Sequence, residues 1–95
     1  MKILIKAEAA ATIIELANFV EAKNTKGSGK RFAVKFMKNI SAQLNNFNKH
    51  LICKYPEFAK LKWKCFAYKN WIIAYQTEAK YIEIKVIIHG TLLNY

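Results

Sequence analysis

Arginine is almost absent from this chain of 95 residues, in which Arg31 is the only one among 16 lysines and arginines. The sequence therefore offers no arginine-rich recognition helix for a DNA groove, and it has no aromatic pattern of the RNP type. Acidic residues are also scarce, six in all, so the formal net charge is +10. A small domain this basic favours a polyanionic or acidic protein partner over a charge that serves solubility alone.

Cysteine is nearly as rare, and the spacing of Cys53 and Cys65 matches no zinc-ligand pattern. We expect no metal site and no cofactor, and we interpret both cysteines as small buried thiols in a reducing compartment. Long apolar runs are absent, which argues against a signal peptide or a membrane span, so the expected location is the cytoplasm. Linkers and repeats are absent too, which predicts a single domain over residues 1–95.

The last third of the chain is rich in β-branched and aromatic residues. Three such runs, Leu61 to Ala67, Asn70 to Thr77 and Tyr81 to Gly90, are separated by short polar breaks. This pattern predicts an antiparallel meander of three strands.

Strict alternation in the last run would place two sets of side chains on opposite faces of the sheet. One face would carry Ile82, Ile84, Val86 and Ile88, and the other Tyr81, Glu83, Lys85, Ile87 and His89. In the first run, Lys60, Lys62 and Lys64 would share one face, opposite Leu61, Trp63 and Cys65. The sheet is thus expected to have an apolar face and a second face where lysines and His89 meet.

The first half of the chain predicts a short strand and two helices. The strand is Lys2 to Lys6, and a helix follows from about Ala7, with an apolar face widened by Ile14 and Phe19. A polar loop with two glycines ends it. A second amphipathic helix is expected from about Lys30 to Leu51, with an apolar stripe that ends at Leu51.

The expected fold is therefore α+β with the order β-α-α-β-β-β, in which a helical hairpin covers the apolar face of a small, mainly antiparallel sheet. This order resembles the RelE/ParE toxin superfamily of bacterial toxin–antitoxin systems over nearly the whole chain. The matching segments are KILIKAEAAATIIEL, the turn Tyr55-Pro56-Glu57-Phe58, the strand WIIAYQ and the closing strand VIIHG.

The resemblance implies a toxin neutralised by an acidic, partly disordered antitoxin, and it implies one of two activities. RelE-like members cut messenger RNA in the ribosome without a metal, and ParE-like members poison DNA gyrase. Lys62 and Lys64 match the paired lysines of the RelE-like pattern, and His89 and Tyr95 are its candidates for proton transfer. Its two arginines are missing, because Ile72 and Leu92 or a neighbour stand in their places.

The missing arginines weaken phosphate stabilisation, so the ParE-like activity, binding to DNA gyrase, is the preferred hypothesis. The RelE-like nuclease is the alternative, and a non-toxic basic nucleic-acid-binding module is a third. The candidate lysines for binding a partner or nucleic acid are Lys60, Lys62, Lys64, Lys69 and Lys85. His89 also has a structural interpretation, as an anchor for the C-terminal tail, and Lys62 and Lys64 have one as charges that discourage edge pairing. For the antitoxin, the polar helix faces, the basic strand face and the edge at Lys2 to Lys6 all remain open.

Overall fold

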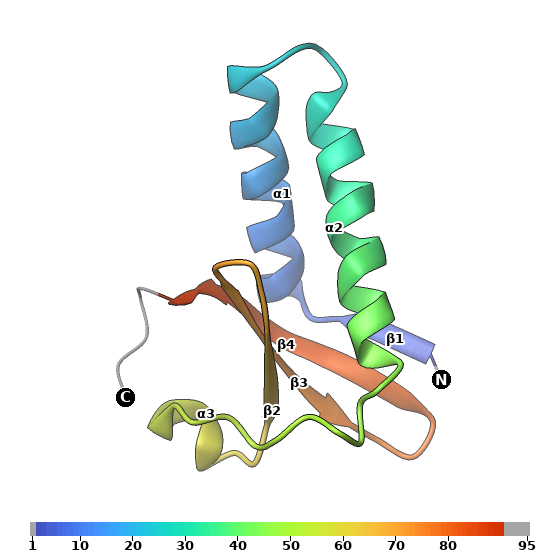
Figure 1. The fold of residues 1–95 in the computed structure, drawn as a ribbon, viewed down its shortest axis with the longest axis vertical. Helices are drawn as coiled ribbons and strands as arrows, with labels where there is room; N and C mark the ends of the chain where they lie inside the picture. Colours follow the sequence, from blue (N-terminus) through green and yellow to red (C-terminus); the bar gives the residue numbers. More distant parts are fainter. Residues whose placement is uncertain (1, 91–95) are drawn as a thin grey trace.

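The computed structural model describes residues 2–90, which form one mixed sheet and three helices (Figure 1). The elements are β1 (Lys2–Ile5), α1 (Ala7–Lys23), α2 (Ser28–Leu44), α3 (Pro56–Ala59), β2 (Lys64–Tyr68), β3 (Trp71–Thr77) and β4 (Tyr81–His89). The strand order is β1-β4-β3-β2, with β1 parallel to β4 and the remaining pairs antiparallel. The predicted α+β class, element order and meander are confirmed. No helix within these residues is long and apolar enough to cross a membrane.

The helical hairpin contacts the sheet through only part of its length. Its buried side chains are Ala9 and Ile13 in the first half of α1 and Phe36, Ile40 and Leu44 in the second half of α2. The loop that joins the helices lies at the end of the molecule farthest from the sheet (Figure 1). Ile14 and Phe19 are exposed, because α1 packs through a narrower stripe than the sequence predicts.

Both faces of the central strand β3 are covered. Ile73 and Tyr75 belong to the main core beneath the helices, whereas Ala74 and Ile72 belong to a smaller cluster on the opposite face. The chain between α2 and β2, which includes α3, covers this second face through Cys53, Tyr55 and Phe58. The central strand is therefore enclosed on both sides.

A β-bulge interrupts the pairing of β3 with β4. Ala74 pairs with Val86, but its neighbour Tyr75 pairs with Ile84, so Lys85 is an extra residue in β4. A bulge of this kind leaves one residue unpaired and bends the strand.

The bulge reverses the faces predicted for the end of β4. Ile87 and His89 lie on the helix side, like Ile82 and Ile84 before the bulge, and Val86 and Ile88 lie on the opposite side. The prediction that His89 points to the non-core face is therefore wrong. Its cause is the single extra residue, which shifts the alternation by one.

Helix α2 is shorter than predicted. It ends at Leu44, and residues 45–49 continue as turns in which four of the five amides bond three residues back, such as Phe47 N to Leu44 O at 3.1 Å. Asparagines in this segment compete with helical hydrogen bonding. The Tyr75 hydroxyl donates to the Phe47 carbonyl at 2.7 Å, and burial raises the pKa of Tyr75 to about 12. Leu51 is 79% exposed and takes no part in the stripe.

Cys53 and Cys65 form a disulfide, so the prediction of two free thiols is wrong. The chain after α2 runs antiparallel to β2, with a bridge between Ile52 and Lys64 and a bond from Cys53 N to Trp63 O at 2.9 Å. This alignment brings the two cysteine Cα atoms to 4.8 Å, within the range that a disulfide requires.

The Glu21 carboxylate of α1 caps the N-terminus of α2. Its oxygens accept hydrogen bonds from Gly29 N at 2.7 Å and from Gly27 N at 3.1 Å. Gly27 has a φ of 87°, which favours glycine, and directs its amide toward Glu21. The hydrogen bond from Gly29, and then that from Gly27, lowers the pKa of Glu21 from its ordinary value of 4.5.

Replacement of Glu21 by glutamine is expected to make the melting temperature less sensitive to acid pH. A carboxylate whose pKa is lowered by folding stabilises the folded state above pH 4.5. This contribution is lost as the pH falls through the pKa of the group in the folded state. Glu21→Gln should lower the melting temperature at neutral pH and reduce its further fall at acid pH. Thermal unfolding at both pH values measures this, with Glu78→Gln, an exposed side chain in the β3–β4 turn, as the control. Equal acid sensitivity of the wild type and Glu21→Gln would contradict the capping role.

Candidate partner-binding site

The structure does not bring the candidate catalytic residues together. Lys62 lies in a turn before β2, with a φ of 60°, and not in the predicted strand. Lys64 lies opposite Tyr75 in the sheet, whereas His89 lies opposite Trp71. These partners are four residues apart on β3, which separates Lys64 from His89 by about 13 Å along the strands. A single catalytic cluster of Lys62, Lys64 and His89 is not formed.

The other positions of the nuclease pattern add no charged group within the described chain. Ile72, which replaces the first arginine, packs in the smaller cluster on the face opposite the helices. Leu92 and Tyr95 lie outside residues 2–90. The His89 ring meets Trp71 edge to face, with the ring centroids 5.1 Å apart. This packing agrees with a structural role for His89.

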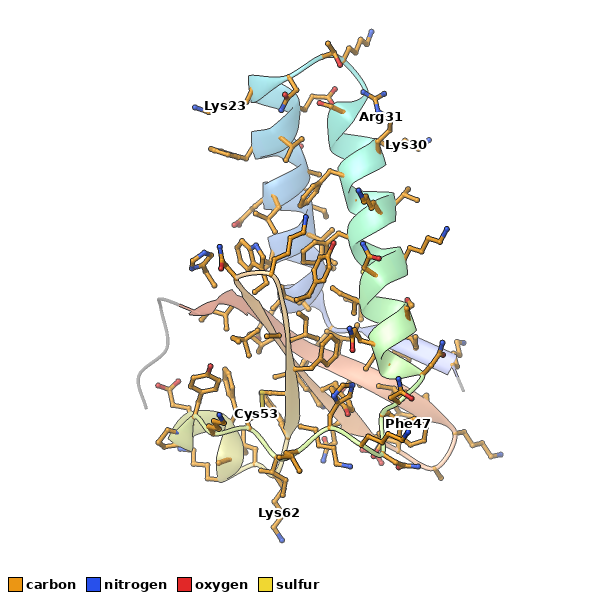
Figure 2. The ribbon with its side chains drawn as sticks, in the orientation of Figure 1. Lys23, Lys30, Arg31, Phe47, Cys53 and Lys62 are labelled. Carbon is orange, nitrogen blue, oxygen red and sulfur yellow. A yellow bond between two sulfur atoms is a disulfide. The ribbon has the colours of Figure 1, made fainter. Side chains whose placement is uncertain are left out.

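The five candidate binding lysines are spread over several surfaces. Lys60 and Lys62 are exposed beside α3, and Figure 2 shows Lys62 at the end of the molecule opposite the helical hairpin's loop. Lys64 is half-buried on the helix side, so the predicted basic strand face does not form. Lys85 is also half-buried and forms an ion pair with Glu83.

The Lys85–Glu83 pair leaves little unbalanced charge at this position. The hydrogen bond from Lys85 lowers the pKa of Glu83 below its ordinary range and keeps the carboxylate ionised. The Lys85 ammonium group also lies 5.9 Å from the centroid of the Trp63 ring. Lys85 is therefore a member of a local polar cluster on the sheet and not a free anion-binding group.

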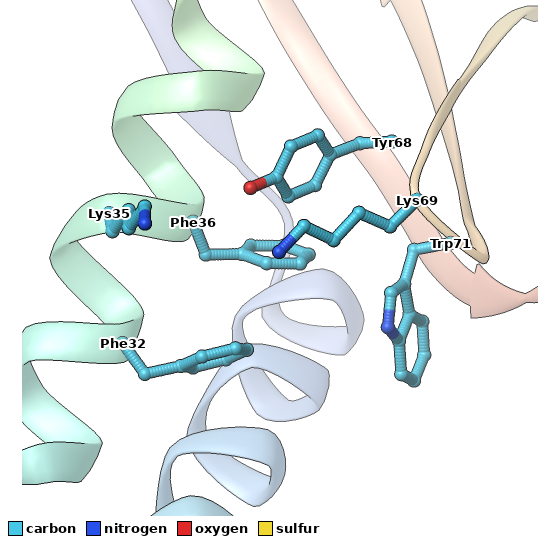
Figure 3. Close-up of a pocket in the computed structure, with 6 residues that line it drawn as sticks. All are labelled: Phe32, Lys35, Phe36, Tyr68, Lys69 and Trp71. Atoms are coloured by element: carbon cyan, nitrogen blue, oxygen red, sulfur yellow. The ribbon is translucent and has the colours of Figure 1, made fainter.

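Lys69 is the candidate lysine that lies beside a pocket. It occupies the β2–β3 turn with a φ of 55°, and its ammonium group lies 5.6 Å from the centroid of the Tyr68 ring. Figure 3 shows Lys69 extending toward Phe36 of α2. The pocket is lined by Phe32, Lys35, Phe36, Tyr68, Lys69 and Trp71.

Ring contacts fix the walls of this aromatic pocket. Phe32 and Phe36 lie one helical turn apart on α2, with centroids separated by 5.5 Å. Phe36 meets Tyr68 edge to face at 5.4 Å, and the Tyr68 hydroxyl accepts a hydrogen bond from Asn39 Nδ2 at 2.8 Å. The pocket is therefore built jointly by the outer part of α2 and the β2–β3 turn, and its rim carries the two cations Lys35 and Lys69.

Sequence reasoning missed this pocket because its walls come from α2 and from the β2–β3 turn, which are far apart in the sequence. The available signal was a pair of phenylalanines four residues apart, Phe32 and Phe36, with a lysine between them. The sequence does not encode the position of the β2–β3 turn locally, because tertiary packing alone brings that turn to α2. The aromatic pocket therefore follows from tertiary packing and not from a sequence motif.

Comparison with known proteins finds a solved structure with a similar fold. No protein-family profile matches the chain, and no curated protein matches it. Among solved structures, a chain from the chromosomal ParDE TA system from P. aeruginosa superposes with a TM-score of 0.59 and 15% sequence identity. The match covers 94% of this chain and 95% of the other. The chain has a ParE-like fold.

The fold is the one implied by the RelE/ParE resemblance that was inferred from the order of elements. At 15% identity the likeness concerns the backbone architecture, and it assigns no role to any side chain. The aromatic pocket and the lysines around it are therefore described from this chain's own geometry.

Proposed function

We propose that this protein is the toxin of a toxin–antitoxin system and that it inhibits growth by binding DNA gyrase. The observation that carries the proposal is the ParE-like fold, which extends over 94% of this chain and 95% of the solved chain. The net charge of +10 supports an acidic antitoxin as the second partner.

Binding is preferred to RNA cleavage because of the arrangement of the basic groups. Cleavage needs several groups around one phosphate, to activate the 2′-hydroxyl, balance the developing charge and protonate the leaving oxygen. Lys64 and His89 lie apart on the sheet, and Lys62 lies in the turn before β2. Ile72 supplies no charge where the nuclease pattern has an arginine. A protein target requires surface complementarity and no such convergence.

Induced expression of the chain in a bacterial host is expected to stop DNA synthesis before protein synthesis. A poisoned gyrase blocks replication directly, whereas translation continues until messages and proteins are depleted. Pulse labelling of new DNA and new protein during the first minutes measures the order. In vitro, the purified chain should inhibit supercoiling by purified gyrase and increase the amount of cleaved DNA.

A matched variant separates this proposal from the nuclease. Lys62→Ala removes an exposed lysine that the nuclease hypothesis makes catalytic, and we expect the effect on DNA synthesis to be unchanged. An early stop in protein synthesis, with messages cut in codons and rescue by Lys62→Ala, would instead establish the RelE-like activity. Unimpaired growth together with salt-sensitive binding to naked nucleic acid would establish the non-toxic binding module.

A further inference from the structure

The outer face of α2 combines positive charge with an exposed apolar centre. A shallow hollow on this face is lined by Lys30, Arg31, Val34, Lys35, Lys38 and Asn39. Four of these residues are cationic and none is acidic. Val34 lies among them with 62% of its surface exposed. An apolar centre bounded by polar groups is the usual anatomy of a protein interface.

This hollow adjoins the aromatic pocket. Lys35 lines both, and Asn39, at the other end of the hollow, donates the hydrogen bond that holds Tyr68 in the pocket wall. Figure 3 shows the pocket between α2 and the β2–β3 turn, and Figure 2 shows Lys30 and Arg31 at the start of α2. The two hollows form one continuous surface, which we call the Lys35 surface.

We propose that the Lys35 surface binds an acidic peptide segment of a protein partner, with one bulky apolar side chain of that segment inserted in the aromatic pocket. The carboxylates of the segment would pair with Lys30, Arg31, Lys35 and Lys38 along α2. The pocket is lined by six residues only, which suits one side chain and not a folded domain. This proposal rests on the proposed function, because the acidic antitoxin would supply the segment.

The charges of the lining residues indicate that the ligand is negatively charged. All the charged groups that line the two hollows are cations, including Lys69 at the pocket rim. The nearest capping carboxylate, Glu21, is already bonded to Gly27 and Gly29. A segment rich in glutamate or aspartate would therefore meet attraction along the whole helix face.

The pocket geometry favours a peptide over a nucleic acid. Stacking of bases requires open aromatic faces. Phe36 is only 3% exposed, the Phe32 ring lies against it at 5.5 Å, and the Tyr68 ring is covered by the Lys69 ammonium group. These three rings offer edges more than open faces to the pocket, and such edges fit an aliphatic or aromatic side chain as an anchor.

Fluorescence anisotropy with synthetic probes tests this proposal. The first probe is a labelled 14-residue peptide of alternating glutamate and alanine with one central leucine, the second has serine in place of leucine, and the third is an oligothymidylate of equal length. We expect the leucine peptide to bind about tenfold more tightly than either other probe at physiological salt. Lys35→Glu should weaken its binding by at least about tenfold, because repulsion replaces attraction at the shared position.

Two further variants make the result specific. Lys38→Glu, on the same helix face, should also weaken binding of the leucine peptide. Lys80→Glu in the β3–β4 turn changes the net charge equally and should leave the affinity for this peptide unchanged. Circular dichroism checks that each variant is folded. Equal affinity for the serine peptide or the oligonucleotide, or equal losses for Lys35→Glu and Lys80→Glu, would overturn the proposal.

Binding and toxicity are separate readouts. A chain that inhibits DNA synthesis but does not bind the leucine peptide would overturn the Lys35 surface and leave the proposed function intact. A chain that binds the peptide but does not inhibit growth would overturn the gyrase proposal and leave the docking surface intact.

Discussion

Reduction of the Cys53–Cys65 disulfide is expected to lower the free energy of unfolding by about 3 kcal/mol. The bridge joins residues separated by 12 positions, so it restricts the unfolded chain by closing a short loop. In the chain-entropy account, a loop of this size gives a contribution of about that magnitude.

The location of the bridge explains why its loss should affect the whole domain. Cys53 and Cys65 link the chain after α2 to β2, next to the cluster that contains Tyr55, Phe58 and Ala74. This cluster is the cover of the sheet face opposite the helices. Without the bridge, only the local hydrogen bonds and the packing of a few side chains hold that cover in place.

Thermal unfolding with and without a thiol reductant measures the effect. We expect reduction to lower the melting temperature by about 15 °C, given the usual relation between stability and melting temperature for a domain of this size. The double variant Cys53→Ala/Cys65→Ala is the control, because it should melt near the reduced wild type and respond to reductant no further. Equal melting of the oxidised and reduced wild type would support the free thiols predicted from the sequence.

The sequence predicts the secondary structure well where the signal is local. Period-two alternation and β-branched composition placed the three meander strands within a few residues, and helical periodicity placed the start of α1 at Ala7. The end of α2 was misplaced because Phe47 and Leu51 continue the apolar spacing beyond Leu44. In the structure, the Tyr75 hydroxyl bonds to the Phe47 carbonyl in a turn, a contact between segments far apart in sequence.

The remaining errors share one physical cause, which is dependence on the alignment of distant segments. The bulge at Lys85 is defined by its pairing with β3, and one extra residue exchanged the faces of Ile87 and His89. The disulfide depends on the antiparallel alignment of Ile52 with Lys64. No pattern within either segment encodes these registers.

The candidate site was predictable in its chemistry and not in its location. Net charge predicted an acidic or polyanionic partner, and Lys69 was among the candidate lysines. The charge instead gathers on α2, where Lys35 joins the basic face to the aromatic pocket. The sequence left the polar helix faces open as one of several partner surfaces, and the tertiary position of the β2–β3 turn distinguishes α2 among them.

Replacement of Gly29 by alanine is expected to separate the two helices of the hairpin. A Cβ atom at this position would lie 2.4 Å from the carbonyl oxygen of Ala17 in α1 and 3.0 Å from the Glu21 carboxylate. The clash with Ala17 involves backbone, which a side-chain rotation cannot relieve. The same shift would pull Gly29 N away from its hydrogen bond with Glu21.

We expect Gly29→Ala to lower the free energy of unfolding by about 2 kcal/mol, since the overpacking exceeds the gain of about 1 kcal/mol from better helix propensity. Chemical denaturation of the oxidised protein measures it. Gly90→Ala is the matched control, because its Cβ would meet Asn70 O at 3.5 Å, an ordinary contact. A Gly29→Ala variant as stable as Gly90→Ala would show that α1 and α2 are not in close contact at this point, and the cap formed by Glu21 would then lose its geometric basis.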